Sequence, residues 1–398
     1  MGEIAEAGTA IPAPMQDAIR HQWQTYDAAL AAGRYWAVNA IFDIFISDQL
    51  PRRRDLWARL RALRGQVPAA ELAAVEALLT TLPLSEHEAD RAALNSKPGR
   101  ISDLMALAQM LQMLAPFDLD TMSEAERVHL VAESMRRAFH DRTFYLGDPD
   151  FVKVPQRTLT SPYYAAGLRS TINRARATPS DLLPGEPTPF LEHDETTHFS
   201  IIDDEGNRVG GTQTVNLLYG SGLIPPGTGF LLNNEMDDFA LKPGTPNAFG
   251  VMGYAANAPE PGKRMLSSMT PTFMESDDRV TVIGTPGGTR IITMVLLGML
   301  GYADGLQAEQ VSALPRYHHQ WLPDVLGIEK DALPADVITR LRAMGHDVLV
   351  PGEDNKGRRS SDAWGNMNTV EWDRKAGVLR AASDPRNPEG QGQVSNAR

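Results

Sequence analysis

The chain has 398 residues, of which 42% are hydrophobic and 22% are charged, a composition typical of a globular protein with about two or three domains or one large core and an appendage. Its formal net charge of −12 argues against a nucleic-acid surface. Because the chain contains no cysteine, disulfides, thiolate metal sites and a cysteine nucleophile are excluded.

The N-terminal part is expected to be helical. Residues 15–92 are rich in Ala, Leu, Arg and Glu, and their apolar residues recur at helical spacing. A polar break at residues 95–100 predicts a separate helical segment over residues 1–98. The first twenty residues contain neither a basic start nor an apolar stretch of signal-peptide length, so no export signal is expected. The most apolar later stretch, residues 291–300, is too short to span a bilayer.

The second part, residues 99–195, begins with two predicted helices. The first has an apolar face over residues 104–114 and is followed by Pro116. The second begins after Ser123, a favourable N-cap residue, and Glu126 stands three positions later as the partner of a capping box. Proline-rich loops follow this helix and lead to the third part of the chain.

The third part, residues 196–398, has the pattern of strands followed by helices. Residues 197–203 and 208–218 flank a polar turn and predict a β-hairpin. A strand over residues 280–283 is expected to lead through a glycine-rich turn into a helix that begins near Arg290. This succession predicts a layered core of sheets and helices.

The junction between Glu195 and Thr196 is the most informative feature of the sequence. A threonine that chain cleavage makes N-terminal is a self-sufficient nucleophile, because its own α-amine can serve as the general base. Thr214 and Asn216 stand two positions apart on the predicted return strand and therefore face the same side. They could orient Thr196, or they could form an ordinary polar strand edge.

Two further groups of polar residues have the chemistry of an amino-acid site. Glu235 and Asp238 could bind a substrate ammonium through charged hydrogen bonds, or they could begin a solvated helix. Ser267 and Ser268 offer two hydroxyl donors to a carboxylate, although a serine pair before Pro271 also suits a turn. Each group alone is compatible with either interpretation.

Gly287 and Gly288 precede the helix that is predicted from Arg290. Glycine lets the backbone approach a ligand closely, and free N–H groups at a helix N-terminus hold anions such as the oxyanion of acyl transfer. The alternative is a plain strand-to-helix turn. Farther on, His318 and His319 are adjacent and lack a third ligand at suitable spacing, so structural packing is expected there and a metal site is not.

Several motifs occur together in the order that is typical of one family. They are YLGDPDF at residues 145–151, TTH at 196–198, LNNEMDDF at 232–239, LSSM at 266–269, GTPGG at 284–288 and ASDPR at 382–386. Through these motifs the chain resembles the gamma-glutamyltransferase family, also called gamma-glutamyltranspeptidases or glutathione hydrolases. The resemblance implies an α+β fold, an αββα sandwich of the N-terminal nucleophile hydrolase type with an incomplete large-subunit part.

The resemblance also implies how the reaction would begin. In this family a precursor cleaves itself into a large and a small subunit, and here the cut would fall after Glu195. Thr196 would then be the nucleophile and the first residue of the small subunit, and Thr214 would position it. Gly287 and Gly288 would supply the amides of the oxyanion hole.

The substrate implied by the resemblance is a γ-glutamyl compound such as glutathione. Asn216, Glu235 and Asp238 would hold its α-amino group, and Ser267 and Ser268 would hold its α-carboxylate. Water, an amino acid or a dipeptide would accept the glutamyl group, and no cofactor is expected. Members of the family are usually exported.

Part of the family's pattern is absent. No segment resembles D-F-R-E-x-A-P, which carries the family's carboxylate-binding arginine, and residues 98–102 stand where Pro-Pro-Ser-Ser-Gly-Gly is expected. Residues 1–98 show no recognised match. Two alternatives follow: a truncated, inactive homologue that serves as a binding or structural module, and a related acylase of the cephalosporin type. The residues suited to an α-amino acid argue against the acylase.

Overall fold

The computed structural model describes residues 101–183, 196–217, 219–247, 250–353, 355 and 364–395. The predicted helical segment over residues 1–98 and the predicted cleavage residue Glu195 lie outside these ranges. Residues 98–223 and 231–398 form one compact unit, which contains all of the described helices and strands.

Both helices that were predicted before Thr196 are present. They are α7 (Ile101–Leu114) and α8 (Glu124–Tyr145). Ser123 is the N-cap of α8, and its Oγ accepts the N–H of Glu126 at 3.4 Å. The capping box is incomplete, because the Glu126 carboxylate accepts a hydrogen bond from the Ser123 hydroxyl at 3.1 Å and not from its backbone N–H. Two short helices follow, α9 (Gln156–Leu159) and α10 (Pro162–Ser170).

The predicted hairpin is confirmed, with a shorter second strand. β1 (Thr196–Ile202) pairs antiparallel with β2 (Arg208–Thr214). Asp203 closes the turn, since its Oδ1 accepts the N–H of Asn207 at 2.7 Å. The prediction extended the second strand to residue 218, but β2 ends at Thr214 because Asn216 adopts a φ of 74°, which breaks the extended backbone.

A four-stranded antiparallel sheet forms the centre of the unit. Its order is β3 (Thr272–Glu275), β4 (Arg279–Gly284), β8 (Asn368–Asp373) and β9 (Val378–Ser383). The predicted strand and the helix after it are both found, as β4 and α11 (Arg290–Ala303). Nearly all of α11 is apolar because it is buried between the sheet and α7.

Among the described residues, five further helices and strands follow α11 and precede β8 along the chain. They are α12 (Ala308–Ser312), β5 (Tyr317–His318), β6 (Leu326–Ile328), α13 (Ala335–Ala343) and β7 (Val348–Leu349). The strands form a three-stranded sheet in the order β5-β6-β7. Asp384, in the ASDPR motif, anchors this region to the central sheet, because it pairs with the buried Arg316 and accepts the N–H of Met367 at 2.9 Å.

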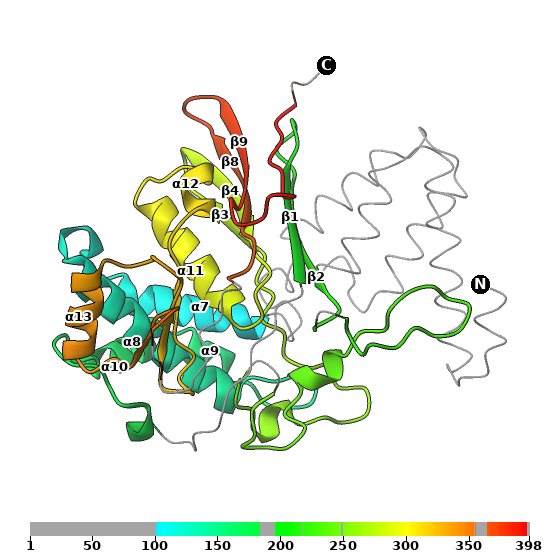
Figure 1. Cartoon of the computed structure of the whole chain (residues 1–398), viewed down its shortest axis with the longest axis horizontal. Helices are drawn as coiled ribbons and strands as arrows, with labels where there is room; N and C mark the ends of the chain where they lie inside the picture. Colours follow the sequence, from blue (N-terminus) through cyan, green and yellow to red (C-terminus); the bar gives the residue numbers. More distant parts are fainter. Residues whose placement is uncertain are drawn as a thin grey trace. The chain divides into compact units, whose positions relative to one another are not determined.

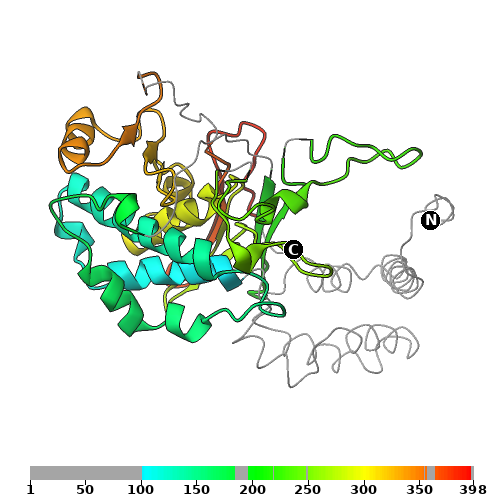
Figure 2. The same ribbon diagram turned by 90° about the horizontal axis from the view of Figure 1, so that it is seen from below.

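The two-stranded sheet of β1 and β2 packs against the four-stranded sheet, and helices cover the far side of the four-stranded sheet (Figures 1 and 2). The hairpin approaches the four-stranded sheet closely because glycines stand at points of contact on both. A Cβ on Gly210 would lie 3.0 Å from Val282, and the His198 ring packs against Gly284. Asn368 Nδ2 donates to His198 O at 2.9 Å and links β1 to β8. The α+β class is confirmed, and the described residues provide two sheet layers and one helical layer of the predicted sandwich.

The outer face of the hairpin is partly apolar. Phe199 and Ile201 on β1 are 41% and 49% exposed, although alternate residues of the same strand face the four-stranded sheet. Phe199 covers Gly211 on the paired strand, where a Cβ would meet its ring at 2.4 Å. In the described part of the chain, no helix combines the length and apolarity needed to cross a membrane.

Several histidines are buried in the uncharged form. Burial lowers the pKa of each below the ordinary value of about 6.5. The pKa falls to about 3 for His198, His318 and His346 and to about 4 for His319. All four side chains are hydrogen-bonded in this neutral state.

These histidines are expected to make the fold sensitive to acid. Between about pH 6.5 and pH 4 the unfolded chain binds protons on them that the folded chain does not, so the free energy of unfolding falls as the pH falls. Each contributes up to about 1.4 kcal/mol per pH unit. Asp103, Glu235 and Asp238, whose pKa values burial raises, act in the opposite sense but are fewer. Urea unfolding at pH 7 and pH 5 should show a lower midpoint at pH 5; an equal or higher midpoint would contradict this prediction.

Candidate active site

The hairpin places the predicted nucleophile beside a second hydroxyl. Thr196 begins β1 and lies directly opposite Thr214, the last residue of β2. Thr196 Oγ1 donates to Thr214 Oγ1 at 3.1 Å. The Asn216 N–H donates to the same Thr214 oxygen at 2.8 Å, since the turn after β2 brings this amide back towards the strand end. Thr197 faces the opposite side of β1 and is exposed.

Asn216 connects the strand end to the predicted acidic residues. Its side chain is buried, and its Nδ2 donates to Asn234 O at 3.1 Å. The Asn234 Oδ1 in turn accepts the Leu217 N–H at 3.0 Å. Asn234 immediately precedes η3 (Glu235–Asp238), a short 3₁₀ helix. The hydroxyl pair and the acids are therefore joined by one run of hydrogen-bonded residues.

Two of the three carboxyl groups of η3, those of Glu235 and Asp238, lie in surroundings that disfavour their negative charge. Burial raises the pKa of Glu235 to about 7, and its Oε1 is buried with no hydrogen-bond partner among the described residues. Burial also raises the pKa of Asp238 well above its ordinary value, and Glu235 adds to this rise, whereas Arg142 opposes it. A cation bound between these groups would stabilise their ionised forms.

One pocket brings Asp238 together with Ser268. Arg142 and Thr289 also line it. Ser267 does not, and its Oγ instead accepts the Met269 N–H at 3.4 Å. Thr196 does not line this pocket. The structure thus brings one predicted acid and one predicted serine to the same pocket and connects Thr196 to it through Asn216 and η3.

The loop that carries the serines is fixed by residues that the sequence did not single out. Asp148 of the YLGDPDF motif accepts hydrogen bonds from the backbone and the guanidinium of Arg264, at 2.7–2.9 Å. Asn257 bridges the acids and the serine loop, because its Nδ2 donates to Asp238 O at 2.7 Å and its Oδ1 accepts the Leu266 N–H at 3.1 Å. The motif itself was a signal for Asp148, but nothing in the sequence pointed to Asn257.

The glycine pair forms the turn that begins α11. Gly287 and Gly288 have φ values of 137° and 53°, in the region that favours glycine. Their carbonyls accept the N–H groups of Arg290 and Ile291 at 3.0 and 3.2 Å. The next residue, Thr289, lines the pocket, whereas neither glycine does.

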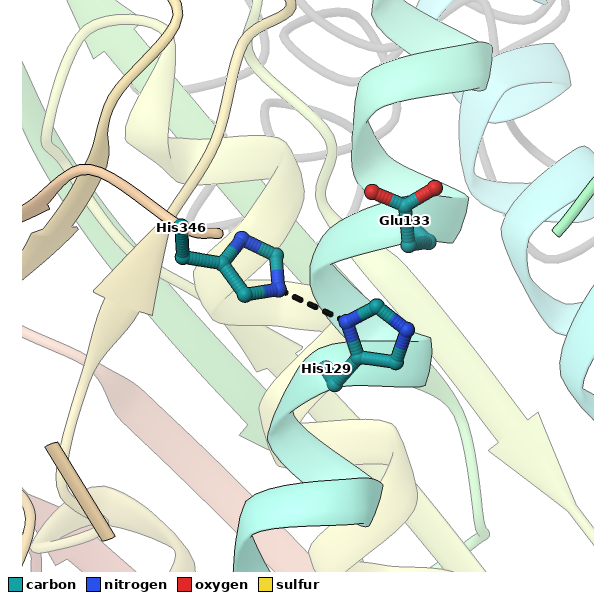
Figure 3. Close-up of side chains that lie close together, drawn as sticks. All are labelled: His129, Glu133 and His346. Atoms are coloured by element: carbon teal, nitrogen blue, oxygen red, sulfur yellow. Dashed lines mark hydrogen bonds between the residues drawn. The ribbon is translucent and has the colours of Figure 1, made fainter. Parts of the chain in front are cut away.

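A separate buried cluster consists of His129, Glu133 and His346 (Figure 3). His129 Nδ1 and His346 Nε2 are hydrogen-bonded at 2.7 Å, closer than the roughly 3.3 Å between two nitrogens in a tetrahedral zinc site. The other His129 nitrogen contacts Asn173 O at 2.8 Å. Glu133 Oε1 accepts hydrogen bonds from Arg136 and from the Thr178 N–H, and Glu133 Oε2 accepts them from Arg137 and from the Thr178 hydroxyl. The atoms that face one another are thus engaged in hydrogen bonds within the core, and His346 Nδ1 is buried with no hydrogen-bond partner among the described residues.

The adjacent residues His318 and His319 are also part of the core. His318 contacts Thr293 Oγ1 at 2.9 Å and Gln320 Oε1 at 2.8 Å through its two nitrogens. His319 Nε2 contacts Asp324 at 3.2 Å. Both side chains are buried, as the packing interpretation expects.

Known proteins resemble this chain over most of its length. A family model described as gamma-glutamyltranspeptidase matches residues 54–394. The glutathione hydrolase proenzyme of Escherichia coli K12 is 38% identical over 328 residues, which are 81% of this chain and 54% of that protein. The corresponding protein of Pseudomonas aeruginosa is 44% identical over 290 residues, 71% of this chain and 49% of the relative. This chain therefore spans about half the length of the curated relatives it matches.

A solved structure supports the fold. The cephalosporin acylase from Bacillus halodurans superposes with a TM-score of 0.58 at 23% identity, over 75% of this chain and 50% of that one. The family match begins at residue 54, inside the segment 1–98 that showed no recognised match, so part of that segment also belongs to the family. The family match over residues 54–394 shows that this chain belongs to the gamma-glutamyltranspeptidase family.

Proposed function

We propose that the chain, once it is cut between Glu195 and Thr196, transfers the γ-glutamyl group of glutathione and related compounds to water or to an amino-acid or dipeptide acceptor. The observation that carries this proposal is the hydrogen bond of 3.1 Å between the hydroxyls of Thr196 and Thr214. The names of the relatives, glutathione hydrolase proenzymes, support both the substrate and the cleavage of a precursor.

In the proposed mechanism the cut frees the α-amine of Thr196, whose pKa near 8 lets it accept a proton close to neutral pH. The amine takes the proton of the Thr196 hydroxyl as Oγ1 attacks the γ-carbonyl carbon of the substrate. The tetrahedral intermediate collapses, the amide nitrogen leaves with a proton, and an ester to Thr196 remains. Water or an acceptor amine then attacks this ester and restores the hydroxyl.

Thr214 is proposed to orient the nucleophile. Its hydroxyl already receives the Asn216 N–H, at 2.8 Å, as well as the Thr196 hydroxyl. This shared acceptor fixes the rotamer of Thr196 and so reduces the freedom that the attack must overcome. The N–H groups of Gly287 and Gly288 are proposed to stabilise the oxyanion, where the loss of one donor costs about 3–4 kcal/mol of transition-state stabilisation.

The acids of η3 are proposed to select an α-amino acid. Glu235 and Asp238 are held where burial disfavours their charge, and a substrate ammonium would supply the missing positive partner. Asn216, whose side chain is hydrogen-bonded to the carbonyl of Asn234 just before η3, completes this subsite. A cephalosporin-type acylase would have no use for two such carboxyl groups, so the γ-glutamyl reaction is the better match.

Replacing Asp238 with asparagine tests this selection. We expect kcat/KM for a γ-glutamyl anilide to fall by about 30-fold or more, because the ammonium loses a desolvated ionic partner. A glutaryl anilide, which lacks the amino group, should be cleaved with an unchanged or higher kcat/KM. Steady-state kinetics with the two substrates would give this comparison.

Asp237→Asn provides the matched control, since Asp237 belongs to the same short helix but does not line the pocket. The control is expected to keep the substrate preference of the unaltered chain. Equal losses on both anilides in Asp238→Asn would remove the support for an ammonium subsite. A chain that cleaves the glutaryl anilide faster than the γ-glutamyl anilide would favour the acylase.

A further inference from the structure

Arg142 is a buried cation at the edge of the candidate pocket. It lies in the last turn of α8 and is only 5% exposed. Its Nε donates to Asp103 Oδ1 at 2.7 Å, and its Nη2 donates to Ser268 Oγ at 3.3 Å. Ser268 and Arg142 line the same pocket as Asp238. The guanidinium therefore reaches the serine that was expected to hold a substrate carboxylate.

The contacts of Arg142 differ from those of a purely structural arginine. Arg137, on the same helix, donates to Glu133, Thr171 and Thr178 and satisfies both carboxylate oxygens of its ionic partner with the help of its neighbours. The ion pair of Arg142 with Asp103 leaves more of its hydrogen-bonding atoms without close partners. Asp103 Oδ2 is buried with no hydrogen-bond partner among the described residues, and Nη2 makes only the long contact with Ser268.

Two groups that line the pocket have opposite chemistry. Asp238 presents a carboxyl group that burial holds away from its ionised form, and Arg142 presents a guanidinium beside a serine hydroxyl. An α-amino acid carries an ammonium and a carboxylate on the same carbon. A guanidinium and a hydroxyl together suit the carboxylate, because arginine forms strong, directional hydrogen bonds with carboxylate oxygens.

We propose that Arg142 binds the α-carboxylate of the γ-glutamyl substrate together with Ser268, while Asp238 binds its ammonium. This assignment rests on the proposed function, and it makes Arg142 a specificity-determining residue. It also gives the chain a carboxylate-binding cation, although no D-F-R-E-x-A-P segment is present. The required arginine comes from the end of a core helix that the motif pattern did not mark.

The test compares two substrates that differ only in the carboxylate. A γ-glutamyl anilide carries it, and a 4-aminobutyryl anilide lacks it but keeps the amine and the scissile amide. With Arg142→Gln, kcat/KM for the γ-glutamyl anilide should fall by about 30-fold or more, mainly through a higher KM, and the value for the 4-aminobutyryl anilide should change by less than about 3-fold. Arg142→Lys should lie between, because it keeps the charge and loses the planar fork.

Arg137→Lys is the matched control, because it alters a buried arginine of the same helix that does not line the pocket. It should lower the melting temperature and leave the ratio of the two kcat/KM values unchanged. If Arg142→Gln does not fold, Arg142→Lys still decides the question through the same ratio. Wild-type ratios in both Arg142 variants would overturn the assignment.

A binding measurement separates this inference from the proposed reaction. If the unaltered chain cleaves neither anilide, the γ-glutamyl reaction fails as a function. Stabilisation of the full chain against heat by L-glutamate, absent with 4-aminobutyrate and lost in Arg142→Gln, would then still support the carboxylate site. Failure of L-glutamate to stabilise the unaltered chain would overturn it.

Discussion

Replacing Thr196 with alanine is expected to lower γ-glutamyl anilide hydrolysis by about 10⁴-fold or more and to leave the chain uncut. Both effects have one cause, because the same hydroxyl is proposed to attack first its own preceding carbonyl and then the substrate. Thr214 and Asn216 cannot replace it, since Thr214 only accepts the hydrogen bond of the Thr196 hydroxyl and the Asn216 N–H donates to Thr214. Anilide release and gel analysis of the purified chain measure the two effects.

Thr197→Ala is a close control for this substitution. Thr197 is the next residue of β1 but faces away from Thr214 and is exposed. The variant should be cut at the same junction and should retain activity within a few-fold. An equal loss of activity in both variants would indicate that the strand, and not the Thr196 hydroxyl, is required; full activity in Thr196→Ala would refute the nucleophile outright.

Replacing Glu133 with glutamine is expected to lower the free energy of unfolding by about 3–5 kcal/mol, because it removes the negative partner of buried charges. Glu133 is fully buried and accepts hydrogen bonds from Arg136, Arg137 and Thr178. Burial alone would raise its pKa, but Arg136, Thr178 and Arg137 outweigh that effect and lower the pKa to about 2. Glutamine would leave two arginines without this compensation.

Glu126→Gln measures the background of such a change. Glu126 lies on the same helix, has a side chain that is 42% exposed and pairs with Arg174 at 3.4 Å. Exposed pairs of this kind contribute about 0–1 kcal/mol, so the control should unfold within that range of the unaltered chain. Urea unfolding of all three proteins gives the comparison. A loss below about 1 kcal/mol in Glu133→Gln would show that the buried network is not stabilising.

Local patterns predicted much of the fold because they reflect short-range physics. The polar turn between two β-rich runs identified the hairpin, and Ser123 identified the start of α8. The end of β2 could not be predicted in this way. Asn216 leaves the strand with a positive φ that depends on its hydrogen bonds to Thr214 and to Asn234, which lies 18 residues later in the sequence.

Residues of the candidate site could be proposed from the sequence where they form motifs, but not where their partners are distant in sequence. Thr196, Asp238 and Ser268 stand in recognisable motifs. Arg142 does not, because an arginine near a helix end usually indicates a solvated face. Only its contact with Ser268, 126 residues away, places it at the pocket. Asn257 was missed for the same reason, since it acts through contacts with two separate loops.

The intact mass of the purified full chain tests the central claim most directly. The account predicts two fragments whose masses meet between Glu195 and Thr196, with a free threonine amine on the second fragment. The Thr196→Ala chain, prepared in the same way, should give one mass that corresponds to the uncut sequence. A single uncut mass for the unaltered chain, or a junction at any other position, would contradict the assignment of Thr196 as the nucleophile that its own cleavage exposes.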